Sequence, residues 1–162
     1  QLTKGAVGCY LSHLKTYKYI AEGDKPYGLI LEDDIIIPKN LHKQIKGVVK
    51  RIPNQWDILL LSCHCISCKR KEIYSSVDKF FWLHCYIITK ECAARLVKEL
   101  GERPIEQQID AELGDMTVSS NWPNIYCVNS SIASQSHSFK TDIQMPIRYS
   151  PYVNAHASVN VN

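Results

Sequence analysis

Three short apolar runs alternate with amphipathic segments along this chain, and that alternation limits its fold more than any other feature. The runs cover residues 27–31, 56–61 and 80–89. The first two are typical of strands buried on both faces of a sheet, and the third is rich in the aromatic and β-branched residues that strands favour. Strands that alternate with helices predict an α/β architecture with at least part of the sheet parallel.

The segments between these runs predict helices and one loop. Residues 7–21, 41–51 and 90–100 carry apolar side chains at helical spacing, and the last segment is closed by Gly101. Residues 62–76 are rich in cysteine and basic residues without a period, which predicts a loop. We expect ligand sites at the carboxyl ends of the strands, as in other α/β sheets.

The size and composition indicate one globular domain. With 162 residues the chain is long enough for a single core, and its 45% of hydrophobic residues exclude a disordered protein. We expect the domain over residues 1–153 and a polar tail over 154–162. The small net charge of +3 and the dispersed basic residues argue against a nucleic-acid partner. No apolar stretch reaches the ~20 residues that a transmembrane helix requires.

The chain begins at Gln1 rather than at a methionine, so we expect a fragment whose sheet lacks its N-terminal strand. Its seven cysteines are an odd number, and Cys9, Cys85, Cys92 and Cys127 lie in apolar segments where free thiols pack as small hydrophobes. These features favour a reducing compartment, which predicts a cytoplasmic protein.

Three acids, Glu32, Asp33 and Asp34, directly follow the first apolar run and precede another. Adjacent carboxylates among apolar residues repel one another and lose solvation, so a cation or a helix end should compensate them. Mg²⁺ or Mn²⁺ is the simplest compensation, because both ions bind one or two protein carboxylates and complete their shell with phosphate oxygens and water. The alternative is a surface turn in which the acids are hydrated.

The order of the three acids suggests separate roles. In extended backbone, Glu32 and Asp34 point to one side and Asp33 points to the other. Asp34 is therefore the first expected metal ligand, with Glu32 beside it. Asp33 is expected to contact the ribose of a nucleotide or to support the ligands.

Two blocks near the start of the chain form a specific combination. Gly8-Cys9 and Ser12-His13 come first, and the run Leu-Ile-Leu-Glu-Asp-Asp occupies residues 29–34. This combination resembles glycosyltransferase family 25, which includes bacterial lipooligosaccharide galactosyltransferases, procollagen galactosyltransferases and viral relatives. The resemblance continues through residues 56–61, 85–96 and 104–109, so it extends over nearly the whole chain.

The resemblance implies a GT-A type, Rossmann-like sheet flanked by helices that binds a UDP-sugar donor. It implies a Mn²⁺-dependent transfer, with inversion, of galactose or glucose to a hydroxyl of a glycan or of a hydroxylysine-type acceptor, as in lipopolysaccharide biosynthesis. The metal would neutralise charge on the departing UDP. A late histidine often completes the metal shell in GT-A enzymes, and His137 is the expected one here. A solvated loop is the alternative for His137.

A second carboxylate should deprotonate the acceptor hydroxyl as a general base. Glu106 occupies the position of the aspartate in the Pro-Val-Asp motif that this segment resembles, and Asp110 comes four residues later. On a helix that spacing would put both carboxylates on one face. Glutamate has a longer side chain than aspartate, so both residues are candidates for the catalytic base.

Four further residues near these segments each have two interpretations. Ser12 and His13 either hydrogen-bond the nucleotide or tie the first helix to the strand that carries the acids. Trp82 and Tyr86 either flank the sugar pocket or pack in the core.

The cysteines Cys63, Cys65 and Cys68, with His64 among them, have three interpretations: a structural zinc site, a redox pair, or a variable loop. A second pair of cysteines at the usual spacing is lacking, which favours the loop.

Two rival functions fit part of the pattern. A catalytically inactive domain that kept the fold would bind ligands or partners without turnover. A metal-dependent phosphoesterase also uses clustered acids, but the sequence has no second cluster with interleaved histidines for two metals.

Overall fold

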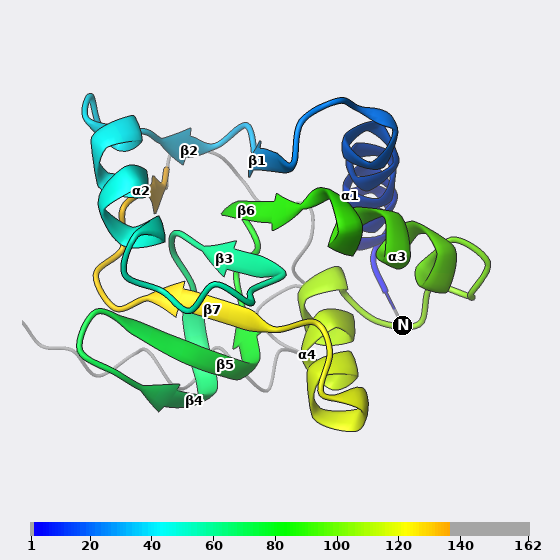
Figure 1. The fold of residues 1–162 in the computed structure, drawn as a ribbon. Helices are drawn as coiled ribbons and strands as arrows, with labels where there is room; N and C mark the ends of the chain where they lie inside the picture. Colours follow the sequence, from blue (N-terminus) through cyan, green and yellow to red (C-terminus); the bar gives the residue numbers. More distant parts are fainter. Residues whose placement is uncertain (1, 137–162) are drawn as a thin grey trace, which may run out of the picture.

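A six-stranded mixed sheet forms the centre of the molecule, and the computed structural model describes residues 2–136 of the chain. The strand order is β1-β6-β3-β7-β5-β4, and within this sheet only the β3–β7 pair is parallel (Figure 1). The strands are β1 Tyr27–Leu31, β3 Ile58–Leu60, β4 His64–Arg70, β5 Tyr74–Phe81, β6 Cys85–Thr89 and β7 Ile125–Val128. The predicted α/β architecture with a partly parallel sheet is therefore confirmed, although antiparallel pairs dominate.

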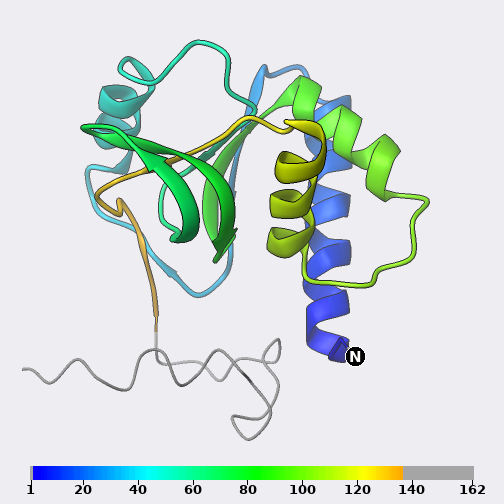
Figure 2. The ribbon, with the colours of Figure 1, turned by 90° about the horizontal axis from the view of Figure 1, so that it is seen from below.

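Helices cover both faces of this sheet. Helices α1, α3 and α4 lie on one side and α2 lies on the other, so the domain has three layers (Figure 2). Their bounds are α1 Lys4–Glu22, α2 Leu41–Val49, α3 Lys90–Leu100 and α4 Ile109–Ser120. Each side has its own apolar cluster, with Leu60 and Tyr86 facing the three helices and Leu59 and Ile87 facing α2. No helix in the described part of the chain is long and apolar enough to cross a membrane.

The predicted helices are confirmed, and side-chain caps explain where two of them begin. The Thr3 hydroxyl oxygen accepts a hydrogen bond from the Ala6 N–H at 3.1 Å and caps α1. The Thr89 hydroxyl accepts from the Cys92 N–H at 3.2 Å and caps α3. Because β6 ends at Thr89 and α3 begins at the next residue, the cap also fixes the sharp turn between strand and helix.

The first apolar run is an edge strand rather than a strand buried on both faces. In β1, which pairs only with β6 in the six-stranded sheet, Ile30 is buried, whereas Leu29 and Leu31, on the opposite face, are exposed. The prediction of burial on both faces is wrong for this run. It is confirmed for β3, whose residues are all fully buried between the two layers.

The segment predicted as a loop is a β-hairpin, so that prediction is wrong. Strands β4 and β5 pair from His64 opposite Phe81 to Arg70 opposite Ser75. Strand β4 lies at the edge of the sheet, where most of its side chains face solvent, and it therefore lacks the apolar pattern that marks a buried strand. The run 80–89 is likewise two strands, β5 and β6, which are separated by residues 82–84.

Four of the seven cysteines are paired. Disulfides join Cys63 to Cys127 and Cys65 to Cys68. The expectation that Cys127 is a free thiol is therefore wrong, whereas Cys9, Cys85 and Cys92 are free. With these bonds formed, the CxCxxC run has no thiolate to offer zinc. The compartment of the protein stays a prediction. Disulfides persist in oxidising environments, so the two pairs argue against the reducing compartment that the sequence favours.

Candidate active site

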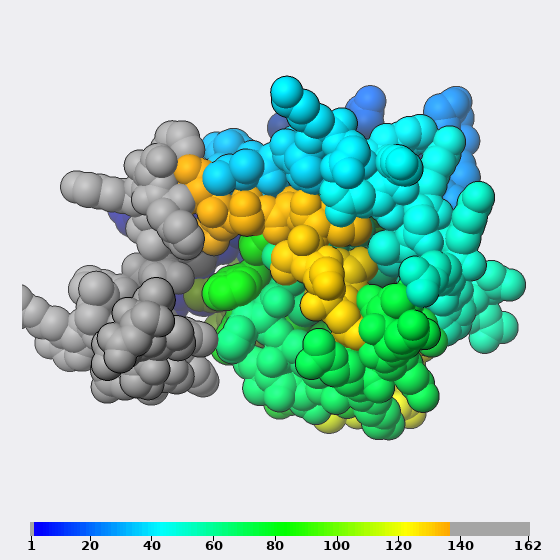
Figure 3. All heavy atoms as spheres, turned by 90° about the vertical axis from the view of Figure 1, so that its left-hand side faces the viewer, coloured from blue at the N-terminus to red at the C-terminus, as the bar shows by residue number. Residues whose placement is uncertain are grey.

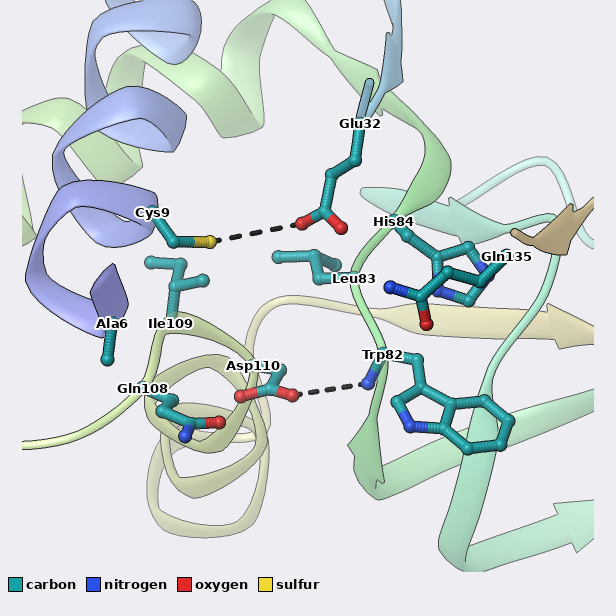
Figure 4. Close-up of a pocket in the computed structure, with 10 residues that line it drawn as sticks. All are labelled: Ala6, Cys9, Glu32, Trp82, Leu83, His84, Gln108, Ile109, Asp110 and Gln135. Carbon is teal, nitrogen blue, oxygen red and sulfur yellow. Dashed lines mark hydrogen bonds between the residues drawn. The ribbon is translucent and has the colours of Figure 1, made fainter. Parts of the chain in front are cut away.

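A pocket opens where the start of α1, the end of β1, the 82–84 segment, the start of α4 and β8 meet (Figure 4). Strand β8 (Ser134–Gln135) pairs with β2 (Ile35–Ile36) in a separate two-stranded sheet. The space-filling view shows this pairing from outside, where the orange residues before 137 lie against the light-blue residues that come after β1 (Figure 3). The residues lining the pocket are Ala6, Cys9, Glu32, Trp82, Leu83, His84, Gln108, Ile109, Asp110 and Gln135.

Glu32 reaches into this pocket from the end of β1. Its backbone N–H donates to the His84 carbonyl at 2.9 Å, which continues the β1–β6 pairing one residue beyond Leu31 and Cys85. Its carboxylate Oε1 lies 3.4 Å from His13 Nε2 and 3.9 Å from Cys9 Sγ. The acid at the carboxyl end of a strand, as the sequence predicts, therefore faces helix α1.

Asp34 is held by the small sheet. Its Oδ2 accepts a hydrogen bond from Gln135 Nε2 at 2.6 Å, and its backbone carbonyl accepts from the Ser136 N–H at 2.7 Å. Its other oxygen, Oδ1, is buried and has no hydrogen-bond partner among the described residues. A buried carboxylate oxygen without a donor is costly unless a ligand satisfies it, and a divalent cation is one such ligand.

The backbone through the acids is a turn, so the prediction of extended backbone there is wrong. Asp33 and Asp34 form the turn between β1 and β2, and Asp33 is exposed. Glu32 lines the pocket, whereas Asp34 adjoins it through Gln135. The predicted roles of the three acids stay predictions.

Asp110 is the second carboxylate in the pocket. It lies in the first turn of α4, is 8% exposed, and accepts hydrogen bonds from the Trp82 N–H at 3.2 Å and the Ala111 N–H at 2.8 Å. Burial raises the pKa of Asp110 above its ordinary value, and the charge of Glu32 raises it further, although the two N–H donors oppose the shift. A buried carboxylate with a raised pKa in a pocket is a candidate for a general base.

Glu106 lies elsewhere. It is exposed, precedes the first residue of α4 and does not line the pocket. The predicted relation of one helical turn between Glu106 and Asp110 is therefore wrong. Of the two candidates for the base, only Asp110 shares the pocket with Glu32.

Trp82 stands at the mouth of the pocket with an unusual backbone. Its φ angle of 75° is positive, which is uncommon for a bulky residue and is often found at functional sites. Trp82 is 46% exposed, and its ring lies 5.2 Å from the His64 ring and 6.2 Å from the His84 ring, measured between centroids. The sequence allows Trp82 either to flank a pocket or to pack in the core, and the structure shows that it lines the pocket.

His84 is a pocket residue that the sequence does not single out for this role. Its side chain is 3% exposed, and its Nε2 has no hydrogen-bond partner in the described part of the chain. Burial lowers the pKa of His84, and the carboxylates of Glu32 and Asp34 oppose that shift. Only the pairing of Glu32 with His84 across two strands could have revealed that His84 lines the pocket, and a single sequence does not show that pairing.

His13 ties helix α1 to the strand that carries the acids, which is one of its two predicted roles. Its Nδ1 lies 2.7 Å from the Tyr86 hydroxyl, which donates to the Tyr17 hydroxyl at 2.8 Å. Tyr86 is fully buried, so core packing is the correct choice for it. Ser12 is exposed, donates to the Gly8 carbonyl within α1 and does not line the pocket. His137 lies outside the described residues.

Comparison with known proteins identifies the family. The model of glycosyltransferase family 25, described as an LPS biosynthesis protein, matches residues 1–111. The chain belongs to glycosyltransferase family 25. The matched part contains Glu32, Asp34, His84 and Asp110, and so includes every carboxylate of the site.

Curated relatives agree at low identity. A procollagen galactosyltransferase 1 from Danio rerio is 26% identical over 107 residues, which are 60% of this chain and 18% of that protein. A glycosyltransferase 25 family member from Anopheles gambiae is 24% identical over 139 residues, 76% of this chain and 22% of that protein. A probable inactive glycosyltransferase 25 family member 3 from Bos taurus is 19% identical over 120 residues, 68% of this chain and 20% of that protein. The chain thus spans about a fifth of the length of these relatives.

Proposed function

We propose that this chain is the catalytic domain of a metal-dependent glycosyltransferase with a GT-A type fold. It would transfer galactose or glucose from a UDP-sugar, with inversion, to a hydroxyl of a glycan or of a hydroxylysine-type acceptor. The observation that carries the proposal is the meeting of Glu32 and buried Asp110 in one pocket, from segments that the family model matches. The names of the galactosyltransferase relatives favour galactose over glucose.

The acids fit a hard divalent cation, Mn²⁺ or Mg²⁺. Asp34 would be its first ligand, because its buried Oδ1 has no donor among the described residues and a cation would satisfy it. Glu32 and His137 are the further proposed ligands. Asp33, exposed in the turn between Glu32 and Asp34, is the proposed contact to the ribose. When bound, such a cation neutralises charge on the diphosphate of the donor.

Asp110 is the proposed general base. Its carboxylate is positioned by the Trp82 N–H and kept from solvent, so it can accept the proton of an acceptor hydroxyl that enters the pocket. Its raised pKa increases its proton affinity, which suits that task. Glu106 remains the alternative base, with less support because it is exposed outside the pocket.

The test is a titration with UDP-galactose and UDP-glucose, with and without Mn²⁺, monitored by calorimetry or by the shift in melting temperature. Binding to the folded state should raise the melting temperature only when metal and nucleotide are both present. Asp34→Asn should lose this shift and keep the fold. Transfer of sugar by Asp34→Asn at the full rate would contradict the metal assignment.

A catalytically inactive binding domain is the second candidate, and the probable inactive relative from Bos taurus is the observation that favours it. The two functions differ in turnover. A domain that binds UDP-galactose with metal but releases no UDP over long incubation with collagen-type or glycan acceptors would support the second candidate.

A further inference from the structure

Three side chains of different chemistry, two of which line the pocket, lie close together beside it. Cys9 and His13 lie one turn apart on α1. Glu32 approaches Cys9 from the end of β1 (Figure 4). Their ligand atoms, Cys9 Sγ, His13 Nε2 and Glu32 Oε1, all lie within 4.8 Å of one another. A thiol, an imidazole and a carboxylate are the three protein ligands that Zn²⁺ prefers.

The distances suit a tetrahedral ion. With Zn–N and Zn–O bonds of about 2.0–2.1 Å and a Zn–S bond of about 2.3 Å, neighbouring ligands are separated by about 3.3 Å for N and O and about 3.5 Å for S and O. The observed separations are 3.4 Å from His13 Nε2 to Glu32 Oε1 and 3.9 Å from Cys9 Sγ to the same oxygen. These two separations are within about 0.4 Å of those in a tetrahedral shell, and the third, from Cys9 Sγ to His13 Nε2, is no more than 4.8 Å.

A buried hydroxyl beside His13 can fix the orientation of its ring for metal binding. Nδ1 of His13 lies 2.7 Å from the Tyr86 hydroxyl, which is itself bonded to Tyr17. With its proton on Nδ1, His13 donates to Tyr86 and turns the lone pair of Nε2 toward the Glu32 carboxylate oxygen 3.4 Å away, and a cation would be held between these two atoms. A hydrogen bond from the opposite ring nitrogen is the usual way to fix the ring of a metal-binding histidine.

No other cation compensates Glu32 in the described part of the chain. Its ion pair is to His13 alone, and neither a lysine nor an arginine pairs with it. Cys9 and Glu32 also line the pocket, so a fourth position on the ion would face the cavity. Three protein ligands with one open position are typical of catalytic rather than structural zinc sites.

We propose that Cys9, His13 and Glu32 form a site for a borderline-soft divalent cation, Zn²⁺, with its open position toward the pocket. This site differs in ligand type from the Mn²⁺ site proposed at Asp34, and the two have only Glu32 in common. A thiolate and an imidazole select Zn²⁺ or Co²⁺ over Mn²⁺. The proposal does not depend on the transfer reaction, because metal binding at Cys9 can be measured without a donor.

The test is titration of the 162-residue chain with Co²⁺ as a spectroscopic substitute for Zn²⁺. The starting protein carries Cys65→Ser and Cys68→Ser, so that the CxxC pair does not contribute thiolates. We expect a near-ultraviolet band from thiolate-to-cobalt charge transfer and visible bands of tetrahedral intensity, both displaced by one equivalent of Zn²⁺. Excess Mn²⁺ should not displace them.

Two variants locate the site. Cys9→Ser should abolish the charge-transfer band, whereas Cys92→Ala, at another free cysteine remote from the pocket lining, should keep it. His13→Gln removes a ligand, so it should weaken Co²⁺ binding by more than the roughly 10- to 100-fold that loss of a partner of a ligand typically costs. Circular dichroism of each variant checks that the fold is retained.

Two results would overturn the proposal. One is the absence of the band from the starting protein, or its survival in folded Cys9→Ser. The other is a nitrogen NMR spectrum in which His13 keeps its proton on Nε2 after addition of Zn²⁺, because the imidazole then donates to Glu32 and leaves no ligand for a metal. Loss of donor binding in Asp34→Asn with an intact cobalt band would show that the two proposed sites are separate.

Discussion

Replacing Asp110 by asparagine separates catalysis from folding at this site. The carboxylate accepts two backbone N–H groups, one on each oxygen, and an amide has only one oxygen for them. Loss of one hydrogen bond to a charged group costs about 1.5–3 kcal/mol. Removal of a buried negative charge beside Glu32 offsets part of that cost, so we expect a net loss of stability of about 2 kcal/mol or less. The variant should therefore fold.

Its activity should fall much further than its stability. A positioned general base contributes typically about 10²- to 10⁴-fold to the rate, and Asp110→Asn should lose a factor in that range in kcat/KM. Glu106→Gln is the matched control. Because Glu106 is exposed and outside the pocket, this change should alter the rate by a factor of about two or less.

The pH dependence gives an independent readout of the same group. Asp110 acts as a base only when ionised, so activity should fall as the pH drops through its raised pKa. That acid limb should disappear in Asp110→Asn. For stability the sign is opposite: the folded chain holds this proton more tightly than the unfolded chain, so Asp110 favours the fold more as the pH falls through its folded pKa.

The assay is UDP release from the donor with acceptor present, measured from about pH 4 to about pH 9 beside urea unfolding of each variant. Full activity in Asp110→Asn, with the acid limb intact, would refute the assignment. Loss of activity in Glu106→Gln with its fold intact would move the base to Glu106.

Two further changes test the packing that supports the site. Gly28→Ala should destabilise the domain by about 1–3 kcal/mol, because the new Cβ would collide with the Ile20 side chain. Gly47→Ala in α2 adds a Cβ that meets no atom within 4 Å, so it should stabilise the domain by about 0.5–1 kcal/mol. Urea unfolding of both variants checks this, and equal stabilities would contradict it. Thr89→Ala should lower the free energy of unfolding by about 1 kcal/mol, because it removes the cap of α3. Thr89→Ser should keep most of that free energy in the same assay. An unchanged urea midpoint for the alanine variant would show that the cap does not stabilise the helix.

Local pattern is enough to predict several elements of the fold. The amphipathic segments of α1, α2 and α3 appear where the spacing predicts them, because a helix buries one stripe that repeats along the sequence. Strand β3 is buried on both faces as its uninterrupted apolar run indicates. The sequence does not predict the hairpin β4–β5, because β4 is an exposed edge strand with little apolar pattern.

The sequence also locates the acids but not their geometry. It puts Glu32, Asp33 and Asp34 at the carboxyl end of a strand, which is a local property of an apolar run and the residues directly after it. It does not show that the chain turns at Asp33, or that Asp110 rather than Glu106 enters the pocket. The turn depends on the pairing of β2 with β8, and the position of Asp110 depends on where α4 begins and on what it packs against.

By itself, then, the sequence determined the helices α1, α2 and α3, the buried strand β3, the position of the acids after a strand, and the family that they resemble, since all of this lies in short-range order. Only the tertiary structure decided which side chains meet. The antiparallel pairing of β1 with β6 sets His84 opposite Glu32, and the packing of α1 on the sheet brings Cys9 and His13 to the same carboxylate. These contacts join residues far apart in the chain. The register of two strands and the rotation of a helix about its axis fix them, and both are properties of the packed whole.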